Sequence, residues 1–234
     1  MKYAEIREAC LEANRAIVEA GLVLLTWGNV SVADREHGVA AIKPTGVDYE
    51  TMSPKDMVVV ELGTGKRVDG ELKPSVDTLI HMTLYEGFPG VGAIVHTHSH
   101  YAVACAQSLK EIPVLGTTHA DFFHGPIPVT AAPTDEEIAE GYEVFTGNTI
   151  VRAVEAKGID PLDTPGALAA FHGPFAWGED AKHAVQNAIV VEEVARLAVD
   201  MGLLHGAEIP GLPRNMLEKH HSRKHGPNAY YGQG

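Results

Sequence analysis

The sequence of 234 residues has few cysteines and shows no obvious targeting segment. Its two cysteines, Cys10 and Cys105, are far apart, and neither belongs to a CxxC pair. Isolated thiols of this kind are typical of a reducing compartment and argue against a disulfide framework. The amino-terminal segment lacks the continuous apolar core of a signal peptide, so we expect a cytoplasmic protein.

Basic residues are also scarce, because 18 Lys and Arg stand against 31 Asp and Glu, for a net charge of −13. This deficit argues against nucleic-acid binding, which usually needs a basic surface. The longest stretch without Asp, Glu, Lys or Arg, residues 87–109, contains three histidines and is therefore not expected to span a membrane. A GxGxxG fingerprint for a dinucleotide is absent as well.

The overall composition is that of an ordinary globular protein, with 45% apolar residues. No repeat, low-complexity tract or linker divides the chain, so we expect one domain. Apolar spacing predicts helices over residues 3–20, 77–85, 101–108, 135–157 (with breaks at Gly141 and Gly147) and 181–201. Short apolar runs predict strands at 30–32, 39–42, 57–62, 93–98 and 167–171. Helices and strands mix without βαβ spacing, which favours a helix-covered mixed or antiparallel sheet.

The unusual abundance is histidine, with 13 residues. His96 and His98 lie two positions apart at the end of a predicted strand, so their side chains point to the same face. Such pairs also occur by chance on solvated strands. His172 ends a second predicted strand, before a stiff aromatic turn at residues 173–178. Three imidazoles with an open fourth position form the ligand set of a catalytic zinc site, which acts as a Lewis acid.

Two other His-x-His architectures fit less well. A cupin-like site needs a glutamate several residues after His98, and residues 101–109 contain no acid. An amidohydrolase barrel needs its pair near the start of a longer chain.

Two loops, 26–29 and 43–46, combine glycine with polar donors and predict an anion-binding pair, although glycine turns are common without a ligand. Ser75 and Asp77 precede a predicted helix. They either cap it or serve a phosphate and a metal. Because the chain is acidic overall, a phosphate site would have to be built locally from these donors and Lys43.

Asp121 lies among an alanine and two phenylalanines, and partial burial would raise its pKa toward the range of a proton-transfer group; the plain alternative is a solvated turn residue. The tail, residues 219–234, concentrates positive charge and two tyrosines. It is either a disordered basic tail or a segment that folds over a neighbouring subunit and supplies arginine and tyrosine to its site.

Six segments carry a resemblance to a known family: Leu25–Ser31, Ile42–Asp48, Ile94–His98, Gly116–Asp121, His172–Gly178 and Arg223–Gln233. They resemble, in the same order, the class II aldolase/epimerase family along essentially the whole chain. The resemblance implies an α/β fold: a single α/β/α domain over residues 1–234 with a central, largely antiparallel β-sheet flanked by helices. It further implies a homotetramer with active sites between subunits, completed by the tail.

The resemblance also implies roles for individual residues. The expected ligands of Zn²⁺, or of Mn²⁺ or another divalent ion, are His96, His98 and His172, with Asp77 close to the metal. The residues expected around a substrate phosphate are Asn29, Lys43, Thr45, Gly46, Ser75 and Arg223. The expected acid/base pair is Asp121 and Tyr231, with His220 nearby.

The implied activity is the interconversion of L-ribulose 5-phosphate and D-xylulose 5-phosphate, as in arabinose catabolism. It would proceed by retro-aldol cleavage of the C3–C4 bond and re-addition of the aldehyde through its other face. One alternative is an aldolase of the same fold that releases the aldehyde; Asp77, where aldolases carry glutamate, favours the epimerase. Another is a metal-binding assembly protein without catalysis.

Two positions depart from the family pattern. Val76 stands where the phosphate loop usually carries the second of two serines, and Thr45 replaces a usual serine but keeps the hydroxyl. The loss at position 76 removes a potential hydrogen-bond donor to the phosphate.

Restoring that hydroxyl with Val76→Ser is therefore expected to lower KM for the phosphorylated sugar in steady-state assays. An unchanged or higher KM would show that the valine is neutral or compensated.

Overall fold

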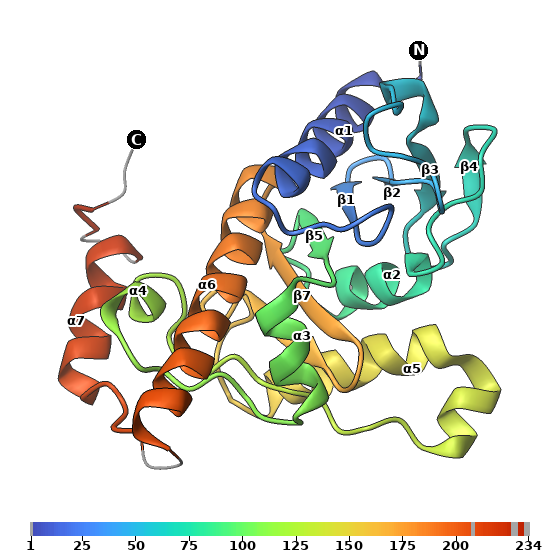
Figure 1. Ribbon diagram of the computed structural model, residues 1–234. Helices are drawn as coiled ribbons and strands as arrows, with labels where there is room; N and C mark the ends of the chain where they lie inside the picture. Colours follow the sequence, from blue (N-terminus) through green and yellow to red (C-terminus); the bar gives the residue numbers. More distant parts are fainter. Residues whose placement is uncertain (1, 207–208, 226–228, 232–234) are drawn as a thin grey trace.

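The computed structural model describes residues 2–206, 209–225 and 229–231 (Figure 1). The helices are α1 (Ala4–Glu19), α2 (Thr78–Gly87), α3 (His100–Gln107), α4 (Thr117–Ala120), α5 (Asp135–Glu155), α6 (Ala181–His205) and α7 (Arg214–Lys224), with a 3₁₀ turn at Pro54–Asp56. The strands are β1 (Asn29–Asp34), β2 (Val39–Ile42), β3 (Val58–Glu61), β4 (Arg67–Asp69), β5 (Ala93–His96), β6 (Gly166–Ala169) and β7 (Gly173–Gly178).

The strands form one seven-stranded sheet in the order β4-β3-β2-β1-β5-β7-β6, and every neighbouring pair is antiparallel. Successive side chains alternate between two apolar clusters. Val30 and Val95 face the layer of α1, α3 and α6, whereas Ile94 and Trp177 face α2 and α5. Figure 1 shows the sheet between these two helical layers. The expected antiparallel, helix-flanked α/β architecture is confirmed.

Residues 173–178 correct one sequence prediction, because they form strand β7 instead of a stiff turn. This strand lies between β5 and β6, and all six of its residues are buried. Pro174 is tolerated because pairing with β5 begins only at Phe175, opposite His96. The turn lies earlier, at residues 170–172, so the predicted strand 167–171 ends at Ala169.

The predicted breaks in α5 have different outcomes. Gly141 does interrupt the helix, with non-helical backbone angles. Gly147 does not, and the prediction of a break there is wrong. A Cβ at Gly147 would lie 2.6 Å from the Cβ of Thr83 in α2, so this glycine permits the two helices to approach closely.

The described part of the tail is folded onto its own chain. Residues 214–224 form α7, which packs against α4. Residues 226–228 and 232–234, which include part of the last family segment, lie outside the described residues.

Cys10 and Cys105 are both free and buried. In the described part of the chain, no helix is long and apolar enough to cross a membrane.

A glutamate on α6 holds the helix that follows the histidine pair. The two carboxylate oxygens of Glu192 accept hydrogen bonds from the backbone N–H groups of Tyr101 and Ala102, each at 2.9 Å. These donors lie in the first turn of α3, where helical partners are missing. Glu192 therefore fixes the start of α3 against α6, just after His98.

Glu192→Ala is expected to lower the free energy of unfolding by about 1–3 kcal/mol, because two partly buried backbone donors lose their acceptor. Urea unfolding followed by circular dichroism measures the change. Glu193→Ala, at the exposed neighbouring position on the same helix, is the matched control and should stay within about 0.5 kcal/mol of the parent. Equal losses in the two variants would contradict the capping role.

Candidate active site

The three histidines singled out in the sequence converge at one end of the sheet. The strand predicted at 93–98 is shorter than expected: β5 ends at His96, and His98 lies two residues beyond it. His172 lies in the β6–β7 turn. One ligand nitrogen from each lies within 4.8 Å of the others. This spacing suits a shared metal ion, so the cluster can hold a divalent cation.

His96 is oriented by the neighbouring strand. Its ring stacks on Phe175 of β7, with centroids 4.2 Å apart and planes 14° apart. Its Nδ1 donates a hydrogen bond to the carbonyl oxygen of Pro174 at 3.0 Å. Its Nε2 is buried and has no hydrogen-bond partner in the described part of the chain. A buried nitrogen without a partner is costly, and a metal ion would supply the missing one.

Burial keeps the three imidazoles neutral. It lowers the pKa of His96 to about 3, although the charge of Asp77 opposes the shift. Burial also lowers the pKa of His98 and of His172, although the charge of Asp77 raises both. Neutral imidazole is the form that binds metal, so the cluster is ready to bind a cation at neutral pH.

Two glycines let the surrounding backbone approach the cluster. A Cβ at Gly28 would lie 2.8 Å from the carbonyl oxygen of His96, and Gly28 also has a φ of +76°. A Cβ at Gly173 would lie 2.8 Å from the carbonyl oxygen of Thr97. Residues 27–29 and 172–174 thus need their central glycines for close contact with the end of β5.

Asp77 lies at the N-cap position of α2 but makes no side-chain capping bond. Its carboxylate instead accepts a hydrogen bond from Nδ2 of Asn29 at 2.8 Å, and the same amide group donates to Ser75 Oγ at 3.0 Å. Burial would raise the pKa of Asp77, but the neighbouring histidines and Asn29 hold it below its usual value. The carboxylate therefore stays ionised, facing the site instead of serving the helix.

A cleft of about 360 Å³ joins most of the predicted phosphate residues to His98, His172 and Asp77 of the predicted metal site, whereas His96 does not line it. Its lining comprises Thr26, Trp27, Gly28, Asn29, Lys43, Pro44, Thr45, Gly46, Ser75, Val76, Asp77, His98 and His172. Of the six residues predicted around a phosphate, only Arg223 is missing from this cleft. The rim is apolar, since Val76 is 67% exposed and Trp27 is 49% exposed.

Lys43 supplies positive charge to the cleft. The residue is 1% exposed, and its ammonium group donates to the carbonyl oxygens of Thr26 and Pro44, each at 3.3 Å, and lies over the ring of Tyr49. Burial lowers its pKa to about 8, although Asp48 opposes the shift. In the described part of the chain this ammonium forms no ion pair, and a buried cation of that kind favours an anion beside it, which fits a phosphate.

The predicted acid/base residues form a second cluster, on α4 and α7. The carboxylate of Asp121 accepts hydrogen bonds from Arg223, at 3.0 and 2.7 Å, and from Nδ1 of His220 at 3.0 Å. The guanidinium of Arg223 also lies over the ring of Tyr231, at 4.4 Å. The structure therefore brings Asp121, His220, Arg223 and Tyr231 together.

The expected pKa of Asp121 is wrong in direction. Burial does raise it, but the hydrogen bonds and charges of Arg223 and His220 outweigh burial and hold the pKa below its usual value. Asp121 is therefore ionised at neutral pH. Arg223, in turn, is engaged with this carboxylate within the chain and does not line the cleft.

The two clusters lie apart in a single chain. In Figure 1, α4 and α7 lie beyond α6, at the left edge of the view, whereas β5, β7 and α2 lie toward the centre and right. One chain therefore carries a metal and anion cleft at one place and a candidate proton-transfer group at another.

Tyr142 of α5 is a neighbour of the cluster that the sequence did not reveal. Its hydroxyl lies 3.4 Å from Nδ1 of His172. The residue belongs to no motif, and the only local signal is the helix break at Gly141 beside it.

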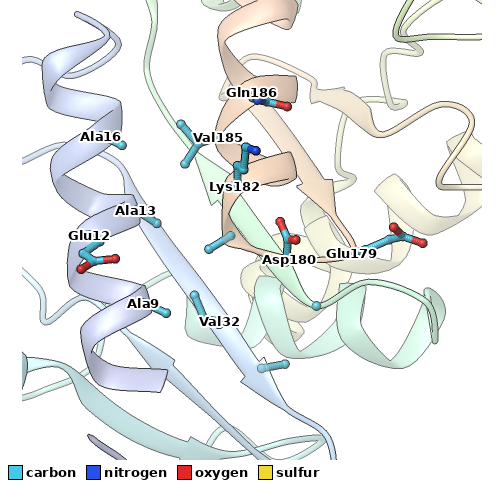
Figure 2. Close-up of a pocket in the computed structure, with 13 residues that line it drawn as sticks. Ala9, Glu12, Ala13, Ala16, Val32, Glu179, Asp180, Lys182, Val185 and Gln186 are labelled. Atoms are coloured by element: carbon cyan, nitrogen blue, oxygen red, sulfur yellow. The ribbon is translucent and has the colours of Figure 1, made fainter. Parts of the chain in front are cut away.

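A larger hollow, of about 580 Å³, lies between α1 and α6 (Figure 2). Alanine and valine side chains such as Ala13 and Val185 line it, with Glu12, Asp180 and Lys182 among its charged groups. It contains none of the histidines. The smaller cleft, by contrast, holds the reactive side chains, so we take it as the candidate active site.

Comparison with known proteins agrees with this geometry. Residues 8–199 match the family described as class II aldolase and adducin N-terminal domain. The chain is 49% identical over 230 residues to proteins named L-ribulose-5-phosphate 4-epimerase UlaF from Salmonella paratyphi A and Salmonella typhi, covering 98% of this chain and 99% of each relative.

Solved structures show the same fold. An L-fuculose 1-phosphate aldolase superposes with a TM-score of 0.79 at 25% identity, covering 94% of this chain and 96% of that one. The L-fuculose-1-phosphate aldolase from Thermus thermophilus gives a TM-score of 0.67 at 25% identity, covering 88% and 99%. With its sheet, its histidine cluster and a family match over most of its length, this chain belongs to the class II aldolase and adducin family.

Proposed function

We propose that the protein is an L-ribulose-5-phosphate 4-epimerase, an isomerase that interconverts L-ribulose 5-phosphate and D-xylulose 5-phosphate. The observation that carries the proposal is the 49% identity, over nearly the full length, to proteins of that name. The cleft supports it independently, because it places metal-binding imidazoles beside a buried lysine.

We propose Zn²⁺ as the resident ion, held by His96, His98 and His172 with Asp77 close by. Three nitrogen ligands and an open position are typical of catalytic zinc. When bound, the cation would polarise the ketose carbonyl and stabilise the negative charge that develops as the C3–C4 bond breaks. The chain's own contribution is to present three neutral nitrogens and an ionised carboxylate at one end of the sheet.

The substrate phosphate would bind in the polar part of the cleft. Lys43 would neutralise it, Ser75 and Thr45 would donate hydroxyl hydrogens, and the loop at Gly46 would allow close approach of backbone. Asn29 already connects Ser75 with Asp77, so it links the phosphate end of the cleft with the metal end.

Proton transfer at the C4 oxygen would fall to Asp121 and Tyr231. Because Arg223 and His220 keep Asp121 ionised, this carboxylate can accept the proton of the C4 hydroxyl. After the aldehyde has turned, its other face is attacked and a C4 alkoxide forms. The hydroxyl of Tyr231 can donate a proton to this alkoxide. His220 would orient Asp121 through the bond at 3.0 Å.

In one chain these groups lie apart from the cleft, so we propose a homotetramer with active sites between subunits, in which a neighbour provides them. Residues 1–234 would act as one domain whose α7 and tail, residues 219–234, complete a neighbour's cleft. The exposed apolar rim supports this arrangement: Trp27, Val76 and the 57%-exposed Phe171, beside His172, suit coverage by another protein surface. We further propose a cytoplasmic location and a place in arabinose catabolism, in line with the free thiols and this substrate.

An aldolase is the second candidate, because the fold is shared with L-fuculose 1-phosphate aldolase. The two activities share the bond cleavage and differ in whether the aldehyde is retained and re-added.

The direct test incubates zinc-loaded protein with L-ribulose 5-phosphate and follows the products by chromatography. We expect D-xylulose 5-phosphate to accumulate, and we expect no turnover of unphosphorylated L-ribulose or by chelator-treated protein. Accumulation of dihydroxyacetone and glycolaldehyde phosphate without the epimer would identify an aldolase instead.

Complementation between subunits tests the shared site. His96→Asn should lose bound zinc and activity while keeping the fold, and Tyr231→Phe should keep zinc and lose activity. If each site takes its cleft from one chain and its tyrosine from another, co-expressed variants should regain roughly a quarter of parental activity, because that fraction of sites has both parts intact. A mixed assembly as inactive as either variant would argue that each chain supplies its own complete site.

A further inference from the structure

We propose that Tyr142 is a positioning residue for the histidine cluster: its hydroxyl fixes the orientation of His172 and the nitrogen that carries its proton. The inference rests on the proposed function only in that the cluster holds a divalent cation. It adds a residue from α5 to a site otherwise built from strand ends and loops.

The contact joins Nδ1 of His172 to the hydroxyl of Tyr142. The Tyr142 hydroxyl lies 3.4 Å from Nδ1, and the ring centroids are 6.3 Å apart with the planes tilted by 38°. The rings are thus not stacked, and the contact is made through the polar atoms. A neutral imidazole carries its proton on one nitrogen and a lone pair on the other. If Nδ1 donates its proton to the phenol oxygen, Nε2 is left with the lone pair for the cation.

His172 needs such a partner more than His96 does. His96 lies in a strand, where the carbonyl of Pro174 accepts the Nδ1 proton. His172 lies in a short turn, and the residue before it, Phe171, has a left-handed φ of 60°, which is unusual for a bulky side chain. Among the described residues, Tyr142 is the hydrogen-bond partner of the His172 ring. Without this hydrogen bond, only the turn would orient the His172 ring.

The local structure of α5 presents Tyr142 to the site. The extended backbone at Gly141 divides the helix, so Tyr142 begins its second part. Thr146 secures this turn by donating its hydroxyl hydrogen to the Tyr142 carbonyl oxygen at 2.7 Å. Burial raises the pKa of the Tyr142 phenol, and although Thr146 lowers it, the charges of Asp77 and Glu143 add to the rise, so the hydroxyl remains protonated.

Tyr142→Phe tests the inference, because it removes the hydroxyl and keeps the ring. We expect the affinity for Zn²⁺, measured by competition with a chromophoric chelator, to fall about tenfold or more. The visible absorption spectrum of the Co²⁺ form should change, while the unfolding midpoint of the metal-free protein should not. Excess metal should restore kcat, since the hydroxyl acts through His172 and not on the substrate.

Tyr101→Phe is the matched control, because Tyr101 lies on α3 and its ring packs on His100 and Arg196, outside the cleft. It should leave both metal readouts unchanged. Unchanged Zn²⁺ affinity in Tyr142→Phe would overturn the positioning role. Parental protein that binds neither Zn²⁺ nor Co²⁺ would overturn both this role and the metal site. Weakened metal binding in Tyr142→Phe, with a parent that does not epimerise L-ribulose 5-phosphate, would support the role and overturn only the proposed substrate.

Discussion

The candidate site depends on holding three neutral imidazoles close together, one of them buried and two half-buried. Burial suppresses their protonation, so they do not repel one another as cations, and a ligand atom such as Nε2 of His96 is left without a partner among the described residues. This arrangement is costly in the absence of a cation. The pairing of β5 with β7 makes it possible, because it places a ring and a carbonyl oxygen where they fix His96.

Around this cluster, charge is arranged locally and not by the chain as a whole. The net charge of −13 would repel a sugar phosphate at long range. Lys43 nevertheless lies buried in the cleft, with two carbonyl oxygens and an aromatic ring beside it. Donors within a few ångströms of a bound phosphate outweigh a distant, screened excess of acidic groups. The composition therefore indicates which macromolecular partners to exclude, and it says little about the substrate.

Sequence patterns succeeded where the signal was local. The patterns predicted the strand at 39–42 with the observed bounds, and the strand expected at 93–98 is present but ends at His96, before His98. They failed at residues 173–178, because Gly-Pro-Phe-Ala-Trp-Gly has the composition of a turn and becomes a strand only between two partners. The expected rise in the pKa of Asp121 failed for a similar reason. Burial was inferred from neighbours in sequence, whereas Arg223 and His220, about a hundred positions away, decide the charge.

The sequence by itself determined the chemistry available to this protein: histidines two positions apart, a lysine and hydroxyls in glycine loops, and segments that resemble one family in the same order. Only the tertiary structure decided which of these groups meet. His96 and Pro174 are 78 positions apart, and their contact exists because antiparallel pairing folds the β6–β7 turn back onto β5. Tyr142 and the ionised state of Asp121 also arise from contacts between distant segments. Residue type and spacing are properties of the chain, whereas burial, hydrogen-bond partners and proton affinity are properties of the folded molecule.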